Sequence, residues 1–244
     1  MKKYGLIGYP LSHSFSKKYF TEKFLRESIT GVSYELYPIA EISELPSLLA
    51  EYPSLVGLNV TIPYKEKVIP YLSDLSPVVE AIGACNCIKI TEGKLVGYNT
   101  DVIGFEKSLK KKLKPHHTKA LILGTGGSSK AVQYVLNKLG ISFIKISRSK
   151  TAETITYEEI DEALLSSHTL IINTSPLGMF PNIEDCPAIP YQFLNASHYL
   201  FDLVYNPTKT KFLASGEEMG ALIENGSDML VDQAEASWAI WNEL

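Results

Sequence analysis

The fold class of this chain is decided by the stretch Lys119-Ala120-Leu121-Ile122-Leu123-Gly124-Thr125-Gly126-Gly127-Ser128-Ser129-Lys130-Ala131. A short apolar strand is followed by a glycine-rich turn, and a helical pattern then continues to about Leu139. A second strand pattern from Ile141 to Ser147 completes a βαβ unit of ordinary size. This unit predicts an α/β protein in which helices cover a parallel sheet.

The glycines in this stretch have the arrangement of a dinucleotide-binding turn. Gly124 permits the turn after the strand, and Gly126 lets backbone N–H groups approach a pyrophosphate at the start of the helix. Gly127 opens the helix, and Ser129 stands at the third position of the common pattern in place of glycine. The stretch therefore predicts a dinucleotide site, and the alternative is a glycine-rich turn that binds nothing.

The end of the next strand distinguishes the two common dinucleotides. NAD-binding folds place a carboxylate there to bind the ribose 2′-hydroxyl. This chain has Ser147-Arg148-Ser149-Lys150 instead, with no acid before Glu153. A guanidinium between two hydroxyls suits a 2′-phosphate through charge-assisted, bidentate hydrogen bonds. The sequence thus favours NADP, and the alternative is a solvated surface arginine.

The composition excludes several classes of protein. Of the 244 residues, 45% are hydrophobic and 20% are charged, as in an ordinary globular protein. A net charge of −4 gives no basic surface for nucleic acid or for an anionic membrane. No apolar run approaches the roughly 20 residues of a membrane span, and the first apolar run ends too early for a signal peptide. Three cysteines are too few for a disulfide framework, so we expect a cytoplasmic protein.

Strand and helix patterns alternate along most of the chain. Before the glycine-rich turn, strands are expected at 3–8, 32–37 and 55–62, and helices at 17–28 and 42–51. A hairpin is expected where the turn Glu92-Gly93-Lys94 joins the apolar runs 85–90 and 95–98, so the first sheet should be mixed. Later strands are expected at 169–173, 199–204 and 221–223, and an apolar helix follows them.

These patterns predict two lobes with a ligand cleft between them. The charged run at 110–117, which contains Pro115, interrupts the helix that Asp101 can cap. We expect a substrate-binding domain at 1–100, completed by the C-terminal helix 227–244, and a Rossmann domain at 101–226. The adjacent His116 and His117 point in different directions, so no metal site is expected.

Lys65 is the first candidate for catalysis. It lies in Asn59-Val60-Thr61-Ile62-Pro63-Tyr64-Lys65-Glu66, at the end of the third predicted strand. Pro63 suits the first position of a helix, so the strand should give way to a helix at this point. Ligands of α/β proteins bind at such strand ends. The alternative for Lys65 is a solvated surface charge.

Other polar side chains occur where a scaffold does not need them, and each has a local explanation. Ser14 and Ser16 in the first loop suit turn hydrogen bonds, and Asp101 suits a helix cap. Asn86 interrupts an apolar strand, and Gln233 on the apolar last helix suits a satisfied core amide. Together with Lys65, these residues predict one cleft.

Eight stretches occur in an order that one family shares: Ser14-Phe15-Ser16, Asn59 to Lys65, Gly83-Ala84-Cys85-Asn86, Gly97 to Asp101, Gly124 to Gly127, Asn173 to Met179, Asp202 to Tyr205 and Met229 to Ala234. Through them, nearly the whole chain resembles the shikimate dehydrogenases, NADP-dependent enzymes of aromatic biosynthesis. Together these motifs are specific for the family, whereas any one of them alone would not be. The resemblance implies a two-lobed α/β enzyme for the reversible, NADPH-dependent reduction of 3-dehydroshikimate to shikimate, and it leaves monomer and homodimer open.

The resemblance also implies a role for each site residue. The substrate carboxylate is held by Ser14, Ser16 and Tyr205. The ring hydroxyls are bound by Thr61, Lys65, Asn86, Asp101 and Gln233, of which Lys65 and Asp101 form the catalytic pair. The NADP pyrophosphate lies on Gly124, Thr125, Gly126, Gly127 and Ser128. The adenosine phosphate lies on Ser147, Arg148 and Ser149, and the nicotinamide is bordered by Leu203 and Gly226.

The chain departs from the family pattern at a few positions. Cys87 replaces the usual threonine after the substrate asparagine, and Ser147 and Ser149 replace asparagine and threonine beside the arginine. Three other functions remain open: a quinate/shikimate dehydrogenase with broader substrate or cofactor use, a non-catalytic NADP-binding sensor, and a methylene-folate dehydrogenase. A sensor should have lost Lys65 or Asp101, and the folate enzyme fits the Ser-x-Ser loop and Gln233 poorly.

Overall fold

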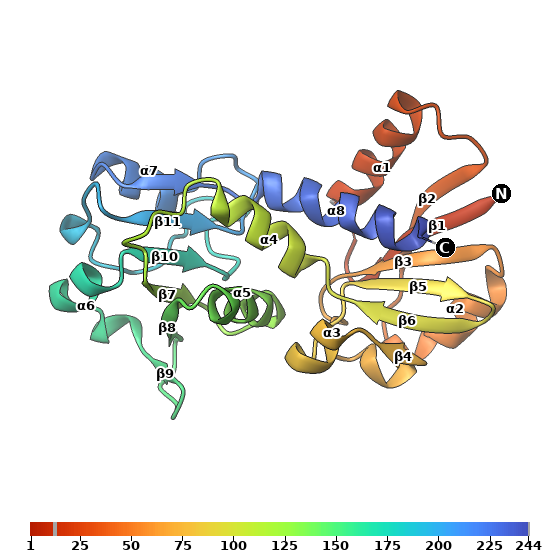
Figure 1. Cartoon of the computed structure of the whole chain (residues 1–244), viewed down its shortest axis with the longest axis horizontal. Coiled ribbons are helices and arrows are strands. Elements are labelled where there is room, and N and C mark those ends of the chain that lie inside the picture. Colours follow the sequence, from red (N-terminus) through yellow and green to blue (C-terminus); the bar gives the residue numbers. More distant parts are fainter. Residues whose placement is uncertain (12–13, 244) are drawn as a thin grey trace. The chain divides into compact units, whose positions relative to one another are not determined.

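The computed structural model describes residues 1–11 and 14–243, so Ser12 and His13 of the predicted first loop and Leu244 of the predicted last helix lie outside the described residues. The chain divides into two compact units (Figure 1). The first unit contains residues 1–100 and 233–244, and the second contains residues 101–232. Each unit has a six-stranded sheet of its own.

The sheet of the first unit has the order β2-β1-β3-β5-β6-β4. Its strands are β1 (Lys2–Gly8), β2 (Val32–Pro38), β3 (Leu55–Val60), β4 (Asp74–Leu75), β5 (Cys87–Thr91) and β6 (Lys94–Tyr98). β1 is parallel to β2 and β3, whereas β5 is antiparallel to β3 and β6. The predicted mixed sheet and hairpin are confirmed, and Glu92 and Gly93 both take the positive φ of a two-residue hairpin turn.

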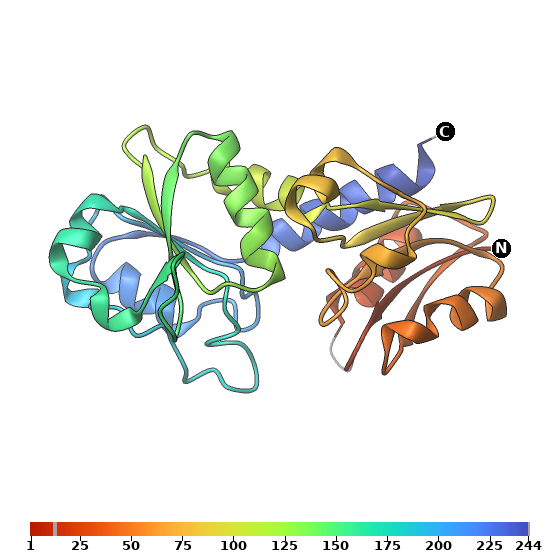
Figure 2. The same cartoon turned by 90° about the horizontal axis from the view of Figure 1, so that it is seen from below.

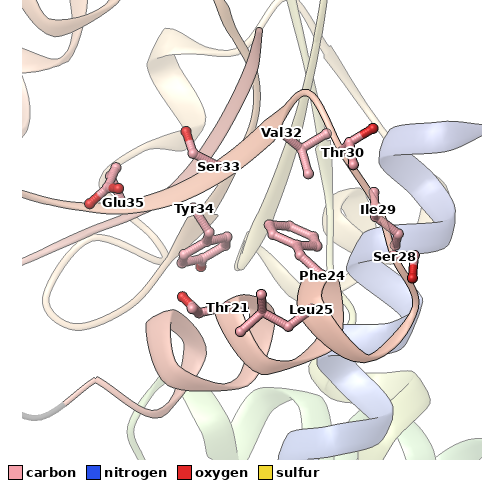
Figure 3. A pocket seen from close by; sticks show the side chains of 10 residues that line it. All are labelled: Thr21, Phe24, Leu25, Ser28, Ile29, Thr30, Val32, Ser33, Tyr34 and Glu35. Carbon is pink, nitrogen blue, oxygen red and sulfur yellow. The ribbon is translucent and has the colours of Figure 1, made fainter.

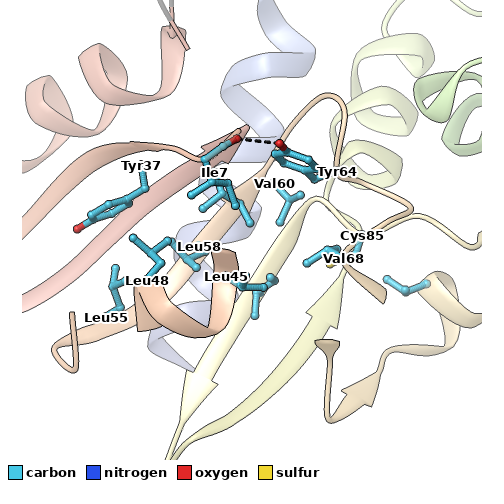
Figure 4. Close-up of a cluster of buried hydrophobic side chains, with 13 residues drawn as sticks. Ile7, Tyr37, Leu45, Leu48, Leu55, Leu58, Val60, Tyr64, Val68 and Cys85 are labelled. Carbon is cyan, nitrogen blue, oxygen red and sulfur yellow. Dashed lines mark hydrogen bonds between the residues drawn. The ribbon is translucent and has the colours of Figure 1, made fainter. Parts of the chain in front are cut away.

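Helices cover both faces of this sheet. One face is covered by α1 (Phe15–Arg26) and α8 (Ser227–Asn242), whose aromatic side chains Phe20 and Trp241 pack with Tyr4 of β1. The other face packs against α2 (Leu45–Glu51), which follows the short 3-10 helix η1 (Ile42–Glu44), and against α3 (Pro77–Ile82). Pro46 lies in the first turn of α2, where no N–H group is required. Figure 4 shows the buried cluster on this second face.

The helix expected to begin at Pro63 does not form. β3 ends at Val60, turns occupy most of residues 61–68, and the next helical element is the 3-10 helix η2 (Ile69–Tyr71). The Ile62–Pro63 peptide bond is cis. Tyr64 is buried, and its hydroxyl donates to the carbonyl of Ile39 at 2.7 Å (Figure 4). Because this ring is fixed inside the core, the backbone after β3 follows the core surface and makes no regular helix.

The second unit has an entirely parallel sheet of order β12-β11-β10-β7-β8-β9. Its strands are β7 (Lys119–Leu123), β8 (Ser142–Ile146), β9 (Thr154–Ile155), β10 (Leu170–Asn173), β11 (Tyr199–Asp202) and β12 (Leu222–Glu224). The strand order reverses between β7 and β10, which is the switch point where doubly wound sheets bind ligands. The predicted parallel α/β sheet is confirmed.

Helices also cover both faces of the second sheet (Figure 2). α4 (Asp101–Lys110) and α5 (Gly127–Lys138) lie on one face, where Phe105 meets Phe201 edge to face. α6 (Glu162–Ser167) and α7 (Lys211–Glu218) lie on the other, where Phe212 packs with Leu121. The 3-10 helices η3 (Tyr157–Glu159) and η4 (Tyr191–Phe193) lie in the connections. Within the described part of the chain, no helix is long and apolar enough to cross a membrane.

Candidate functional site

The predicted substrate residues of the first unit are built around the carboxyl ends of β1 and β3. Thr61 follows β3, and its backbone N–H donates to the carbonyl of Ile7 at 3.0 Å. Its methyl group lies against Gly8, where an added Cβ would come within 2.4 Å of it. Tyr9 N–H donates to the carbonyl of Ile62 at 3.1 Å. The first loop and the segment after β3 are therefore held together by main-chain contacts.

Lys65 lies in the same segment after β3 as Thr61. Its backbone carbonyl accepts the N–H of Cys85 at 2.7 Å, and the carbonyl of Asn86 accepts the N–H of Val60 at 2.9 Å. These bonds place the segments of Lys65 and Asn86 next to each other. Lys65 is half-buried, whereas Lys67 is exposed.

A buried hydrogen-bond network surrounds Asn86. Its Oδ1 accepts the backbone N–H of Thr100 at 2.6 Å, and its Nδ2 donates to Thr100 Oγ1 at 3.0 Å. Thr100 Oγ1 also lies 3.1 Å from Ser237 Oγ and 3.4 Å from Gln233 Oε1. Buried amides are normally paired in this way, and the pairing fixes the orientation of Asn86. The network joins the predicted residues Asn86 and Gln233.

Four members of this network were not predicted as site residues. Asn59 accepts the hydroxyl of Tyr34 at 2.8 Å and donates to Ser237 Oγ at 3.0 Å. Asn59 and Thr100 are polar residues at the ends of apolar strands, and Ser237 lies one helical turn after Gln233. These are weak signals that could have indicated three of the four. Tyr34, in the edge strand β2, carries no such signal.

The side chain of Ser14 has no hydrogen-bond partner among the residues that the structure describes. It stands immediately before α1, yet it makes no capping hydrogen bond, and its buried hydroxyl has no hydrogen-bond partner among the described residues. Residues 1–11 and 14–243 therefore contain no turn hydrogen bond that accounts for this side chain. Leaving such a group unpaired costs about 1–3 kcal/mol, which a ligand can recover. Ser16 approaches Tyr34, where a hydrogen bond opposes the strong rise in the pKa of Tyr34 that burial causes.

The glycine-rich turn of the second unit follows β7. Gly124 has a φ of +112°, and an added Cβ would lie 2.9 Å from Thr174 Oγ1, so glycine is required there. Gly126, by contrast, has an ordinary φ of −73°, and an added Cβ would meet nothing within 4 Å. The turn itself does not need glycine at this position. The open space lies at the N-terminus of the 12-residue helix α5, where backbone N–H groups favour an anion.

The segment after β8 contains the residues predicted to bind the adenosine phosphate. Ser147 is half-buried, and Arg148 and Ser149 are exposed. The nearest following acid, Glu153, pairs with Lys145 at 2.5 Å. This pairing lowers the pKa of Glu153, so its carboxylate is already engaged as an ion pair. The only other side-chain charges in the segment 147–153 are the cations Arg148 and Lys150.

The remaining predicted residues of the second unit follow β11 and precede α8. Leu203 directly follows Asp202, and Tyr205 stands two residues later; burial raises the pKa of Tyr205. An added Cβ at Gly226 would lie only 2.2 Å from the carbonyl oxygen of Leu203, so these two backbones are in close contact.

The substrate residues are thus divided between the units. Asp101, the buried first residue of α4, and Tyr205 belong to the second unit. The first unit contains the other six, which are Ser14, Ser16, Thr61, Lys65, Asn86 and Gln233. Their roles stay predictions. Among the described residues, no group of three or more His, Cys, Asp or Glu side chains is arranged to hold a metal ion.

The first unit also has an apolar groove of about 520 Å³ between α1 and β2 (Figure 3). Phe24, Leu25 and Val32 contribute to its wall, together with the ring of Tyr34. None of the predicted substrate residues lines this groove. Tyr34 connects the two regions, since its hydroxyl reaches Asn59.

Known proteins match both units. The family model of the shikimate dehydrogenase substrate binding domain matches residues 6–88. A shikimate dehydrogenase (NADP(+)) from Clostridium beijerinckii is 38% identical over 256 residues, which cover 100% of this chain and 93% of the relative. The chain belongs to the shikimate dehydrogenase family. The predicted family is therefore confirmed.

Solved structures of shikimate dehydrogenases have the same architecture. The enzyme from Thermus thermophilus, in complex with NADP(H) and shikimate, has a TM-score of 0.88 at 27% identity, covering 100% of this chain and 94% of that one. The enzyme from Listeria monocytogenes, in complex with shikimate and NAD, has a TM-score of 0.88 at 25% identity, covering 99% and 91%. The likeness to shikimate dehydrogenases thus extends over both units.

Proposed function

We propose that this protein is an NADP-dependent shikimate dehydrogenase, which reversibly reduces 3-dehydroshikimate to shikimate in chorismate and aromatic amino-acid biosynthesis. The observation that carries the proposal is the buried hydroxyl of Ser14 at the start of α1, which has no hydrogen-bond partner in the described part of the chain and lies in the same unit as Lys65 and Asn86. A hydroxyl without a partner at a helix N-terminus suits a carboxylate oxygen. Relatives with this enzyme name, which match 100% of this chain and 90–93% of their own length, support the same function.

Substrate binding would use polar groups of both units. Ser14, Ser16 and Tyr205 hold the carboxylate. The ring hydroxyls are bound by Thr61, Asn86, Asp101 and Gln233. The bonds from Asn86 to Thr100 fix the orientation of the amide.

Lys65 would manage the proton. NADPH supplies the hydride when it is bound. The ammonium of Lys65 stabilises the negative charge that develops on the carbonyl oxygen and donates its proton to that oxygen. In the reverse direction, the neutral amine accepts the proton from the hydroxyl. Asp101 positions Lys65 and one ring hydroxyl.

The second unit would bind the cofactor through a site that its residues fit. The open space at Gly126 and the N-terminus of α5 suit the pyrophosphate, which Gly124, Thr125, Gly127 and Ser128 also surround. Arg148, flanked by Ser147 and Ser149, binds the 2′-phosphate. Leu203 and Gly226 border the nicotinamide.

The domain roles follow from these assignments. Residues 1–100 with the helix 227–244 form the substrate-binding domain, and residues 101–226 form the NADP-binding domain. We place the enzyme in the cytoplasm as a monomer or a homodimer.

Cofactor consumption by the purified protein tests the proposal. NADPH oxidation is measured with 3-dehydroshikimate and with 3-dehydroquinate, and both assays are repeated with NADH. A strong preference for NADPH and 3-dehydroshikimate is expected, with Lys65→Ala as the control for contaminating enzymes. Comparable rates with 3-dehydroquinate would instead indicate a quinate/shikimate dehydrogenase. NADPH binding without any turnover would indicate a sensor.

A further inference from the structure

Consecutive loops at the carboxyl end of the second sheet are joined to one another. The loop after β10 is tied to β7, because the backbone N–H and the Oγ1 of Thr174 both donate to the carbonyl of Leu123 at 2.9 Å. The loop after β11 is tied to β10 through the N–H of Leu203, which donates to the carbonyl of Asn173 at 3.0 Å. The turn before α8 is tied to the loop after β11 through Gly226 N–H and the carbonyl of Val204, at 3.2 Å.

A carboxylate lies at the centre of these contacts. Asp202 is fully buried at the end of β11. Its Oδ1 accepts Asn173 Nδ2 and the backbone N–H of Val204, both at 3.0 Å, and its Oδ2 accepts Thr210 Oγ1 at 2.6 Å. One side chain thus fixes the end of β10, the backbone after β11 and the N-terminus of α7. None of the predicted site roles involves it.

The network of Asp202 extends in two directions. Asn173 Oδ1 accepts the N–H and the hydroxyl of Ser175 at 3.0 and 2.6 Å, so the loop after β10 is ordered by the same amide that binds Asp202. On the other side, Leu203 is confined by Gly226, which has no room for a Cβ. The backbone of Leu203 and Val204 therefore has little freedom as long as the carboxylate is present.

The order of the strands says which part of a dinucleotide these loops meet. The pyrophosphate turn follows β7, and Arg148 follows β8 on one side of it. A dinucleotide lies across the carboxyl ends of such a sheet, so the end opposite the 2′-phosphate falls on the side of β10 and β11. We propose that Asp202 is a positioning residue for the nicotinamide end of the cofactor site, and that it acts by holding the loops after β10 and β11. This inference rests on the proposed function.

Two ligands can distinguish a positioning role of Asp202 from general damage to the cofactor site. NADPH has a nicotinamide end, whereas adenosine 2′,5′-bisphosphate contacts only the side of Arg148. Removing all three hydrogen bonds with Asp202→Ala should lower kcat/KM for NADPH roughly 10- to 100-fold, since displacements of about 1 Å near reacting groups have effects of this size. The dissociation constant of adenosine 2′,5′-bisphosphate should stay unchanged. Asp202→Asn should recover most of the activity, because its carbonyl can still accept from Asn173 and Val204.

Control variants complete the experiment. Asp161→Asn changes an aspartate that accepts a backbone N–H at the start of α6. It should change neither kcat/KM for NADPH nor the dissociation constant of adenosine 2′,5′-bisphosphate. If Asp202→Ala does not fold, Thr210→Val replaces it, since it removes one of the three bonds; Thr210→Ser, which keeps the hydroxyl, is its reference. Equal weakening of both ligands in these variants would overturn the positioning role. A wild-type protein that does not bind NADPH would overturn the proposed function itself.

Discussion

The side-chain carbonyl of Asn86 accepts the backbone N–H of Thr100 at 2.6 Å, and the residue after Thr100 is Asp101. The predicted substrate amide is therefore fixed by the residue that adjoins the predicted catalytic carboxylate. Thr100 returns a second bond through its hydroxyl, which accepts Asn86 Nδ2 at 3.0 Å. Both contacts are buried within the first unit, and they connect two positions that are 14 residues apart in the sequence.

Thr100→Val tests whether this network stabilises the first unit. Valine has nearly the same shape, but it leaves Asn86 Nδ2 without its buried acceptor. We expect the free energy of unfolding in urea to fall by about 1–3 kcal/mol. Thr100→Ser keeps the hydroxyl, so its free energy of unfolding should fall by less. A valine variant as stable as the serine variant would show that the hydroxyl network contributes nothing.

Lys65→Ala tests the proton donor. General acid catalysis contributes roughly 10²- to 10⁴-fold, so kcat should fall by about this factor. The dissociation constant of NADPH, measured by fluorescence titration, should not change, since Lys65 belongs to the first unit. Lys67→Ala removes an exposed lysine two residues away and should leave both quantities unchanged. Near-normal turnover in Lys65→Ala would refute the catalytic role.

Gly126→Ala tests the pyrophosphate site apart from the fold. The φ of −73° suits alanine and the added Cβ meets no protein atom, so the melting temperature should stay the same. A bound pyrophosphate would meet the new methyl group. We expect NADPH to bind roughly 10- to 100-fold more weakly, as for other overpacked contacts. Unchanged NADPH affinity would mean that the turn binds nothing.

Arg148→Leu tests the choice of cofactor. Hydrogen bonds to a charged group contribute about 1.5–3 kcal/mol, so KM for NADPH should rise roughly 10- to 100-fold. KM for NADH, which has no 2′-phosphate, should change little. Lys150→Leu is the matched control, because Lys150 is also exposed but pairs with Glu159. Equal effects of Arg148→Leu on both cofactors would remove the basis for assigning NADP from this residue.

Asp202 predicts a pH dependence of stability. Burial raises its pKa from an ordinary 3.8 to about 6, although Thr210, Val204 and Asn173 oppose the shift. The folded state then holds a proton more tightly than the unfolded state, so stability falls as pH rises from about 4 to about 6. The whole effect is about 3 kcal/mol.

Urea unfolding at several pH values measures this slope in the wild type and in Asp202→Asn, which cannot titrate. Subtracting the variant isolates Asp202 from His117 and His168. Burial lowers the pKa of those two histidines, so their contribution to stability has the opposite sign and is lost as the pH falls. Parallel curves for the wild type and the variant would contradict the raised pKa.

Much of the fold was readable because its signals are local. The apolar run before Gly124 predicted β7, and the turn Glu92-Gly93 predicted the hairpin. The helix predicted from Pro63 was wrong, because the preference of proline for a first helical position is local. The conformation of the segment after β3 depends instead on Tyr64, whose ring and hydroxyl make contacts distant in sequence. Propensity is a weak guide where tertiary packing decides.

The site could be predicted only in part, because many of its contacts join residues that are distant in sequence. Asn86 and Gln233 stood out as polar residues in apolar surroundings, and the structure joins them through Thr100. The part played by Tyr34 could not be predicted, since its bond to Asn59 spans two strands that are not neighbours in the sheet. The buried network of Asp202 is equally non-local, because its partners come from β10 and α7.

The first unit depends on a helix that is translated last. Trp241 stacks on Tyr4, donates to the carbonyl of Ile88 at 2.9 Å and fills a slot that Gly57 leaves open. These partners leave the ribosome long before Trp241, because all of residues 101–232 are translated in between. During that time the nascent first unit exposes the aromatic face that α8 later covers. The first unit can therefore complete its aromatic core only after the second unit has been translated.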